Sequence, residues 1–329
     1  MARAISPADL IARRSGPANY ALIDVQEKGE FNLAQIEGAS PVPRGDFEWR
    51  IGQLVPNPSV PLILYCSDGR RSALAAATAE RLGYQDVSYL EGGLEAWRAA
   101  GQQTIEGWGV PGKDYGEKVA VVEDIPQITP EELAERQAKG ERFVILDSRT
   151  VPEYEANHLP GAYAVPGGQL PIEVIDLIGE GDPTVVVNCA GRTRSILGAH
   201  LLRRMGLPKV TAFKNGTMAW HMAGYQLERG PDPRGEHAPS PEARAAAERF
   251  ADRLVAEENL ESMTPEELRA LQESGELHYL IDVRLPAEYE AGHIPGAISC
   301  QAGQLALTSE QIVGVRSAPI VMTCDGRAR

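Results

Sequence analysis

Hydrophobic and polar positions follow one alternating pattern along this chain. Short apolar runs rich in β-branched residues, such as residues 183–188, predict buried strands. Segments with apolar residues at helical spacing, such as residues 195–205 before Gly206, predict helices with a glycine stop signal. Strands and helices that alternate in this way predict three-layer α/β domains with mainly parallel sheets.

The pattern occurs three times in a fixed register. Each copy opens with a helix cap followed by proline, and an aspartate ends an apolar run 18 residues later. A cysteine follows 42 residues after each aspartate, so the matching positions are Ser6, Asp24 and Cys66; Thr129, Asp147 and Cys189; and Thr264, Asp282 and Cys324. Offsets of 123 and 135 relate successive copies, which predicts tandem repeats.

The repeats predict four segments. They are a first unit over residues 1–112, a second unit with its leading linker over 113–228, a linker with a helix over 229–258, and a truncated third unit over 259–329. Compared with the other two units, the third lacks about 30 residues of core after its cysteine. We therefore expect Cys324 to be inert and the chain to be a fragment of a longer multi-repeat protein or a truncated product.

Composition limits the classes of partner that the protein is expected to bind. A net charge of −14 and a pI near 5.0 argue against nucleic acid or an anionic membrane. No run approaches 18 apolar residues, and residues 1–16 lack the apolar core of a signal peptide, so a cytoplasmic protein is expected. The four cysteines are widely separated and form no CxxC, which argues against a zinc site or a disulfide framework; no metal or cofactor is expected.

Candidate chemistry concentrates at Cys189, where a predicted strand turns into a predicted helix. The positive end of a helix and nearby guanidinium groups favour a thiolate and bind anions. We therefore predict that Cys189 is a nucleophile. The predicted anion-binding residues are those that follow it, namely Ala190, Gly191, Arg192, Thr193, Arg194 and Ser195.

Cys66 is the second candidate nucleophile, with Arg70 and Arg71 as its anion-binding residues. Asp68 lies two residues from this sulfur, and a carboxylate there opposes both a thiolate and an anionic substrate. The first unit is therefore either a weak second site or a structural or regulatory unit. Cys300 has no neighbouring arginine or helix start, so a buried, unreactive thiol is expected.

Three charged residues of the second unit are expected to support its cysteine loop. We predict that Asp147, Arg149 and Glu153 form one network of ion pairs and hydrogen bonds and take no part in proton transfer. In the first unit Gln26 stands where the second unit has Arg149.

Two pairs of motifs resemble the rhodanese-type sulfurtransferase family. The segment IDVRLPAEYEAGHIPGA at 281–297 matches 146–162, and LEGGLEAW at 90–97 matches 213–220, with the cysteine loop between them. The resemblance covers nearly the whole chain. It implies tandem rhodanese-like domains, as in multi-domain bacterial thiosulfate sulfurtransferases.

This resemblance implies that Cys189 attacks the outer sulfur of thiosulfate, releases sulfite, and passes the persulfide sulfur to cyanide or to a thiol or protein acceptor. Two alternatives stay open, a persulfide relay or binding module without turnover and a phosphatase-like oxyanion enzyme. Related phosphatase-type domains place the arginine six positions after the cysteine, whereas here it follows by five, at Arg71, Arg194 and Arg329. The residues leave open whether units pair within one chain or in a homodimer.

Overall fold

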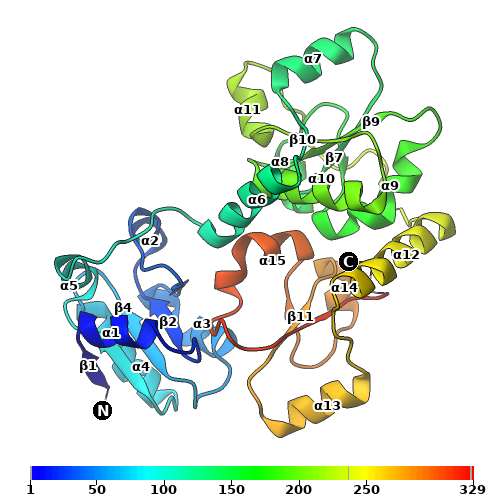
Figure 1. Cartoon of the computed structure of the whole chain (residues 1–329). Helices are drawn as coiled ribbons and strands as arrows, with labels where there is room; N and C mark the ends of the chain where they lie inside the picture. Colours follow the sequence, from blue (N-terminus) through cyan, green and yellow to red (C-terminus); the bar gives the residue numbers. More distant parts are fainter. Residues whose placement is uncertain (1, 236, 327) are drawn as a thin grey trace. The chain divides into compact units, whose positions relative to one another are not determined.

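The computed structural model describes residues 2–235, 237–326 and 328–329 (Figure 1). Contacts divide the chain into two compact units. The first unit comprises Met1–Val110, Thr264–Tyr279 and Thr308–Val321, and the second comprises Pro111–Met263, Leu280–Leu307 and Met322–Arg329. Among the described helices, none is long and apolar enough to cross a membrane.

The first repeat forms a five-stranded parallel sheet in the order β1-β5-β4-β2-β3. Its strands are β1 (Arg3–Ile5), β2 (Ala21–Asp24), β3 (Ser40–Pro41), β4 (Leu62–Tyr65) and β5 (Val87–Leu90). Its helices are α1 (Pro7–Arg14), α2 (Lys28–Leu33), the 3₁₀ turn η1 (Arg44–Asp46), α3 (Phe47–Leu54), α4 (Arg70–Arg81) and α5 (Gly93–Ala99).

The second repeat has the same topology, in the order β6-β10-β9-β7-β8. Its strands are β6 (Gln127–Ile128), β7 (Phe143–Asp147), β8 (Tyr163–Ala164), β9 (Thr184–Asn188) and β10 (Val210–Phe213). Its helices are α7 (Pro130–Ala138), α8 (Val151–Ala156), η2 (Gly167–Gln169), α9 (Leu170–Ile178), α10 (Thr193–Met205) and α11 (Gly216–Met222). Helix α6 (Val110–Val122) precedes the repeat and α12 (Pro241–Glu257) follows it.

The third repeat forms a sheet of three described strands in the order β12-β11-β13. These are β11 (Tyr279–Asp282), β12 (Ile298–Ser299) and β13 (Ile320–Thr323). The accompanying helices are α13 (Pro265–Ser274), α14 (Pro286–Ala291), α15 (Ala302–Thr308) and the 3₁₀ turn η3 (Ser309–Gln311).

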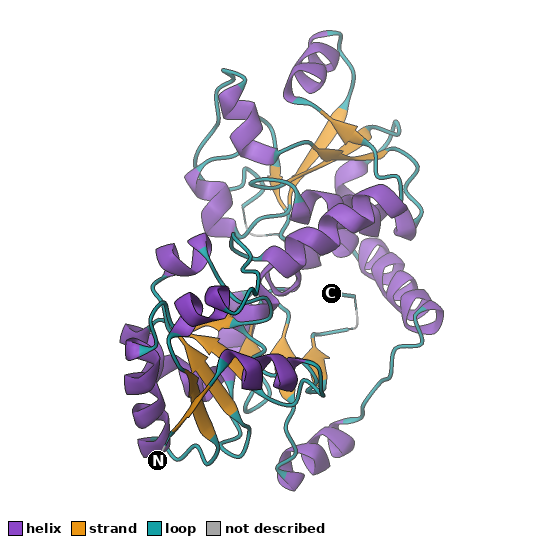
Figure 2. Ribbon diagram, turned by 60° about the vertical axis from the view of Figure 1, so that its left-hand side comes forward, coloured by secondary structure: helices purple, strands orange, loops and turns teal. Residues whose placement is uncertain are grey.

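Helices cover both faces of the sheet in the second repeat, as the purple helices around the orange strands of Figure 2 show. Val185 and Val187 of β9 pack on one face with residues of α9 and α10. Val186, between them, packs on the other face with residues of α7, α8 and α11. Alternate residues of a strand point to opposite faces, so the predicted three-layer α/β architecture is confirmed.

The predicted helix caps are present in all three repeats. The side chains of Ser6, Thr129 and Thr264 accept a hydrogen bond from the backbone three residues on, and each is followed by proline. Gly206 ends α10 in the left-handed conformation, with φ of 111°. Sequence and local structure therefore agree at these boundaries.

In each complete repeat the first residue of the last helix is a glycine that packs against the cysteine loop. The Cys189 carbonyl accepts a hydrogen bond of 2.9 Å from Thr217 N at the start of α11. A Cβ atom on Gly216 would lie 2.1 Å from that carbonyl oxygen, and its φ is +61°. The first repeat has the same arrangement: a Cβ atom on Gly93 would lie 2.1 Å from the Cys66 carbonyl oxygen. Only glycine allows the strand end and the following helix to approach this closely.

Within the second compact unit, the second and third repeats touch through equivalent positions. A Cβ on Gly167 would lie 3.2 Å from Gly303 Cα, and one on Gly168 would lie 3.3 Å from Ala302 Cβ. The offset of 135 makes Gly167 equivalent to Ala302 and Gly168 equivalent to Gly303. Each contact is therefore the mirror of the other, as in the interface of a two-fold dimer.

The second strand of each complete repeat ends in a fully buried aspartate. Arg149 neutralises Asp147 with hydrogen bonds of 2.8 and 2.7 Å. In the first repeat Gln26 donates to Asp24 instead, at 2.9 Å, and brings no charge. Burial therefore raises the pKa of Asp24 to about 7, because its hydrogen bonds only partly offset the loss of water.

We predict that G216A destabilises the second repeat far more than G224A. Gly224 has a φ of +86° but open space around its Cβ position, so alanine there adds backbone strain alone. The expected loss in free energy of unfolding is about 1 kcal/mol for G224A and at least about 3 kcal/mol for G216A. Urea unfolding measures both values, and equal losses would refute the close-approach argument.

We also predict that Q26R flattens the pH dependence of stability. With a folded pKa near 7 and a normal value of 3.8, the stabilising contribution of Asp24 is complete below about pH 4 and is lost as pH rises through 7. The loss amounts to at most about 4 kcal/mol. An arginine at position 26 would pair with Asp24, in the geometry of the Arg149–Asp147 pair, and favour the charged form of Asp24. Thermal melts between pH 4 and 8 test this, and an unchanged profile in Q26R would contradict it.

Candidate active site

The two predicted nucleophiles occupy equivalent places at the ends of central strands. Cys189 follows β9 and Cys66 follows β4, and each precedes a helix that runs away from the sheet. Both thiols are buried, with exposed fractions of 2% and 0%. The side chain before Cys189 is held by Asp147, to which Asn188 donates at 2.9 Å. The strand end is therefore fixed by side chains as well as by the sheet.

The backbone N–H groups around Cys189 have no internal acceptor. Among the described residues, none accepts a hydrogen bond from the N–H groups of residues 190–195. Three of these groups belong to the first turn of α10, where a helix leaves its N–H groups unpaired and carries partial positive charge. The loop can therefore bind an anion, or an anionic sulfur on Cys189, through its backbone.

The last arginine of each cysteine loop forms an ion pair inside its own repeat. Arg194 donates to Glu153 at 2.7 and 2.8 Å, and Arg71 donates to Glu30 at 2.7 and 2.6 Å. Arg329 pairs with Glu288 in the same way. The three pairs, each 41 residues apart, tie the loop to the helix that follows the second strand.

Glu153 therefore lies outside the network predicted for it. Arg149 pairs with Asp147, whereas Glu153 pairs with Arg194 and caps α8 through Thr150 N at 3.1 Å. Burial opposes the charge of Glu153, but the Arg194 guanidinium outweighs it and lowers the pKa of the carboxyl group to about 2. The prediction of a single network is therefore wrong: Arg149 pairs with Asp147, and Glu153 forms a separate ion pair with Arg194.

The other predicted anion-binding arginines also have carboxylate partners. Arg192 donates to Glu117 at 2.5 and 2.8 Å and to Gln127 at 3.0 Å. Arg70 is largely exposed, and its Nε lies 3.5 Å from Asp68. Arg192 and Arg194 thus lie in the Cys189 loop as predicted, but both guanidinium groups form ion pairs with carboxylates of the protein.

The two loops differ most in what approaches the sulfur. Cys66 Sγ lies 3.6 Å from an Asp68 oxygen and 3.7 Å from Ser72 Oγ. Asp68 also accepts from Arg70 N at 3.0 Å, so it removes one N–H group from the first loop. Ala190 and Gly191 occupy the matching stretch of the second loop and carry no polar side chain. The side chain at the second position after the cysteine is therefore a carboxylate in the first loop and a glycine in the second.

Two segments cover the Cys189 loop within the second unit. Helix α6 lies against the start of α10, where a Cβ on Gly116 would be 3.0 Å from Thr193 Cγ2. Gln304 of α15 accepts a hydrogen bond of 3.0 Å from Arg194. The linker between the first two repeats thus packs onto the second repeat as helix α6, and the third repeat places the Gln304 side chain beside the loop.

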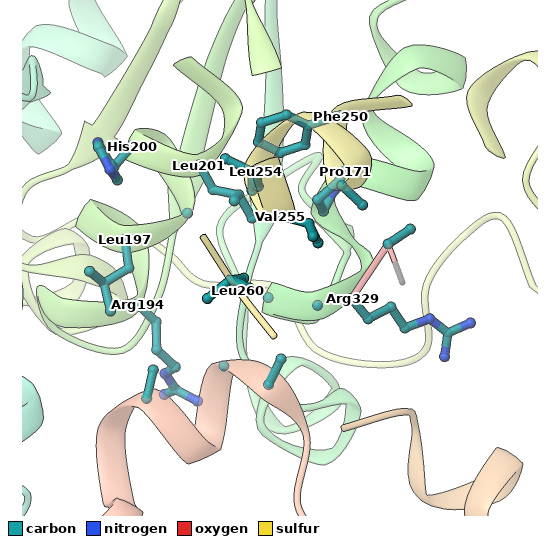
Figure 3. A pocket seen from close by; sticks show the side chains of 18 of the residues that line it. Pro171, Arg194, Leu197, His200, Leu201, Phe250, Leu254, Val255, Leu260 and Arg329 are labelled. Atoms are coloured by element: carbon teal, nitrogen blue, oxygen red, sulfur yellow. The ribbon is translucent and has the colours of Figure 1, made fainter. Parts of the chain in front are cut away.

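A cavity of about 380 Å³ opens next to Arg194. Figure 3 shows apolar side chains of α10 and α12 around it, with Arg194 and Arg329 on opposite sides of the view. The labelled apolar side chains are Pro171, Leu197, Leu201, Phe250, Leu254, Val255 and Leu260. Because both arginines are paired with glutamates, the cavity offers apolar walls and little free charge.

The remaining cysteines are unlike Cys189. Burial raises the pKa of the Cys300 thiol to about 11, which fits the predicted unreactive residue. Cys324 is half-buried at the end of β13. Among the described residues, no group of three or more His, Cys, Asp or Glu side chains is arranged to hold a metal ion.

Glu117 and Gln304, which contact the two loop arginines, were not predicted from the sequence. Their partners lie 75 and 110 residues away, beyond any local pattern. The Glu153–Arg194 pair did leave a signal, because the same two residue types recur 41 residues apart in every repeat.

Comparison with known proteins finds similar thiosulfate sulfurtransferases and a similar segment of a larger sulfurtransferase. The crystal structure of thiosulfate sulfurtransferase from Pseudomonas aeruginosa is 35% identical, with a TM-score of 0.91 over 99% of this chain and 63% of that one. The thiosulfate sulfurtransferase of Azotobacter vinelandii is 26% identical over 256 residues, covering 66% of this chain and 93% of that protein. The probable adenylyltransferase/sulfurtransferase MoeZ of Mycobacterium tuberculosis is 32% identical over 93 residues, 28% of this chain and 24% of that protein.

The chain thus spans less than two thirds of the Pseudomonas protein and about a quarter of the mycobacterial one. The family model described as the rhodanese-like domain matches residues 6–100, 129–223 and 264–329, the three predicted repeats. The predicted resemblance is confirmed, and the chain belongs to the rhodanese-like sulfurtransferase family.

Proposed function

We propose that this chain is a thiosulfate sulfurtransferase that carries sulfur as a persulfide on Cys189. The observation that carries the proposal is the set of N–H groups of residues 190–195 around a cysteine before α10, for which no described residue is a hydrogen-bond acceptor. Such a loop stabilises a negative sulfur at the position of Cys189 and an anion above it.

In the first step, the Cys189 thiolate attacks the outer sulfur of thiosulfate. An S–S bond forms to Cys189 as the bond between the two thiosulfate sulfurs breaks, and sulfite leaves with that electron pair. The persulfide keeps the negative charge on its terminal sulfur, where the loop N–H groups can donate to it. No external general base is required when the thiol is already ionised.

In the second step, cyanide or a thiolate attacks the terminal sulfur. The S–S bond breaks, thiocyanate or a new persulfide leaves, and the Cys189 thiolate is restored. Donor and acceptor use the same sulfur in turn, so the mechanism is ping-pong. The names of the Pseudomonas and Azotobacter relatives support thiosulfate as the donor class.

Cys66 is the lesser site in this proposal. The Asp68 carboxylate 3.6 Å from its sulfur repels both a thiolate and a thiosulfate dianion, and it occupies one N–H group of the loop. The first repeat therefore contributes chiefly structure.

A persulfide relay is the second candidate. Cys189 is only 2% exposed, and α6 and α15 contact Thr193 and Arg194 of its loop, which suits a sulfur that is discharged when a protein acceptor displaces one of these helices. A relay would load sulfur from thiosulfate but would turn over slowly with cyanide.

We predict that C189S lowers thiosulfate:cyanide turnover by about 10²-fold or more, because the nucleophile is lost. C66S is the matched control and should keep most of the activity. The thiocyanate product is measured colorimetrically. Loss of activity in C66S alone would reverse the assignment of the two sites.

Mass spectrometry after thiosulfate treatment separates the candidates. A gain of about 32 Da, one sulfur atom, on the Cys189 peptide is expected for either sulfur-transfer function. Loading together with thiocyanate formation supports the enzyme, and loading without turnover supports the relay. Hydrolysis of an aryl phosphate, with neither loading nor turnover on thiosulfate, would overturn both in favour of a phosphatase-like enzyme.

A further inference from the structure

We infer that Glu117 of α6 is a positioning residue that controls how tightly the Cys189 site binds its donor. In the free chain the Glu117 carboxylate is bound to the Arg192 guanidinium. When thiosulfate binds, its sulfonate group displaces that carboxylate from the guanidinium. This inference rests on the proposed function of the same site and names a residue outside the cysteine loop that sets its preference for anions.

Close packing places Glu117 beside the loop. A Cβ on Gly112 would lie 2.5 Å from the Ala306 carbonyl oxygen, and one on Gly116 would lie 3.0 Å from Thr193. These two glycines, one helical turn apart, let α6 approach both the start of α10 and α15. Glu117 follows directly and reaches Arg192, the residue before α10.

The contact copies the one that an oxyanion would make. Both oxygens of Glu117 accept from Arg192, at 2.5 and 2.8 Å, so the guanidinium is bound by two parallel hydrogen bonds. A sulfonate presents two oxygens with similar spacing. Arg192 is three residues from Cys189, and the sulfonate of a bound thiosulfate lies on the side of the reacting sulfur away from the cysteine.

The exposure of this pair makes it exchangeable. The side chains of Arg192 and Glu117 are 30% and 51% exposed, whereas Arg194 in its pair with Glu153 is 8% exposed. Water-exposed ion pairs are held by about 0.2–1 kcal/mol. An anion that also gains the loop N–H groups can therefore displace Glu117, while Arg194 stays with Glu153 as part of the framework.

The charges are close enough to interact. The hydrogen bonds that Arg192 donates to Glu117 contribute most to the raised pKa of Arg192, and the charge of Cys189 adds a smaller contribution in the same direction. The Arg192 guanidinium therefore interacts electrostatically with the sulfur of Cys189 as well as with Glu117. The first repeat has Gly69 at the matching position, so this ion pair distinguishes the second repeat from the first.

The test compares E117Q with E141Q in the full chain. Glu141 forms a similarly exposed pair with Arg136 at 2.8 Å, away from the cysteine loop, and serves as the matched control. E117Q should lower the KM for thiosulfate about two- to fivefold without lowering kcat, because Arg192 no longer has to be released. R192Q should raise the KM, and the double variant should behave as R192Q does.

Calorimetric titration with sulfite gives a second readout that does not need turnover. E117Q should tighten sulfite binding by the same factor, and E141Q should leave it unchanged. An E117Q variant with unchanged sulfite affinity, or with a lower kcat and a lower melting temperature, would show a merely structural pair and overturn the inference. If the wild-type chain binds sulfite and E117Q tightens it but neither turns over thiosulfate, the proposed function fails and this inference stands.

Discussion

The pairing of each loop arginine with a glutamate 41 residues earlier is the interaction on which the site depends. The glutamate caps the helix after the second strand, and the arginine ends the cysteine loop, so one ion pair joins two segments that the sheet only brings near each other. In the second repeat this pair is nearly buried on the arginine side, where solvent screens it least. The loop conformation, and with it the direction of its N–H groups, follows from that anchor.

Because this ion pair uses the arginine, the proposed function assigns anion binding mainly to the backbone. The N–H groups of residues 190–195, which have no acceptor among the described residues, supply fixed partial charges that need no reorganisation, whereas the guanidinium paired with Glu153 supplies rigidity. The first repeat shows the contrast. It keeps this ion pair, yet Asp68 lies beside its cysteine and the neutral Gln26 replaces the arginine that pairs with the aspartate, so the framework is preserved while the charges around it change.

The sequence predicted the fold well because its signals were local and repeated. Ser6, Thr129 and Thr264 cap helices as their proline neighbours indicated, and the runs ending at the buried aspartates are parallel strands. Helix α6 was not predicted, because two glycines and a proline lower its helix propensity and its contacts are tertiary. For the same reason Glu117 and Gln304 could not be predicted, and only the repeated spacing of Glu153 and Arg194 could have been read beforehand.

The reciprocal contact of Gly167 and Gly168 with Gly303 and Ala302 also bears on how such a chain can change over time. Such a reciprocal contact is expected when gene duplication fuses the two identical subunits of a symmetric dimer into one chain. Once joined, the two halves mutate separately although they still share one surface. A larger side chain at Gly167 would crowd the Gly303 backbone, and one at Gly168 would crowd the Ala302 side chain. A substitution on one side of this contact therefore calls for a compensating change on the other side.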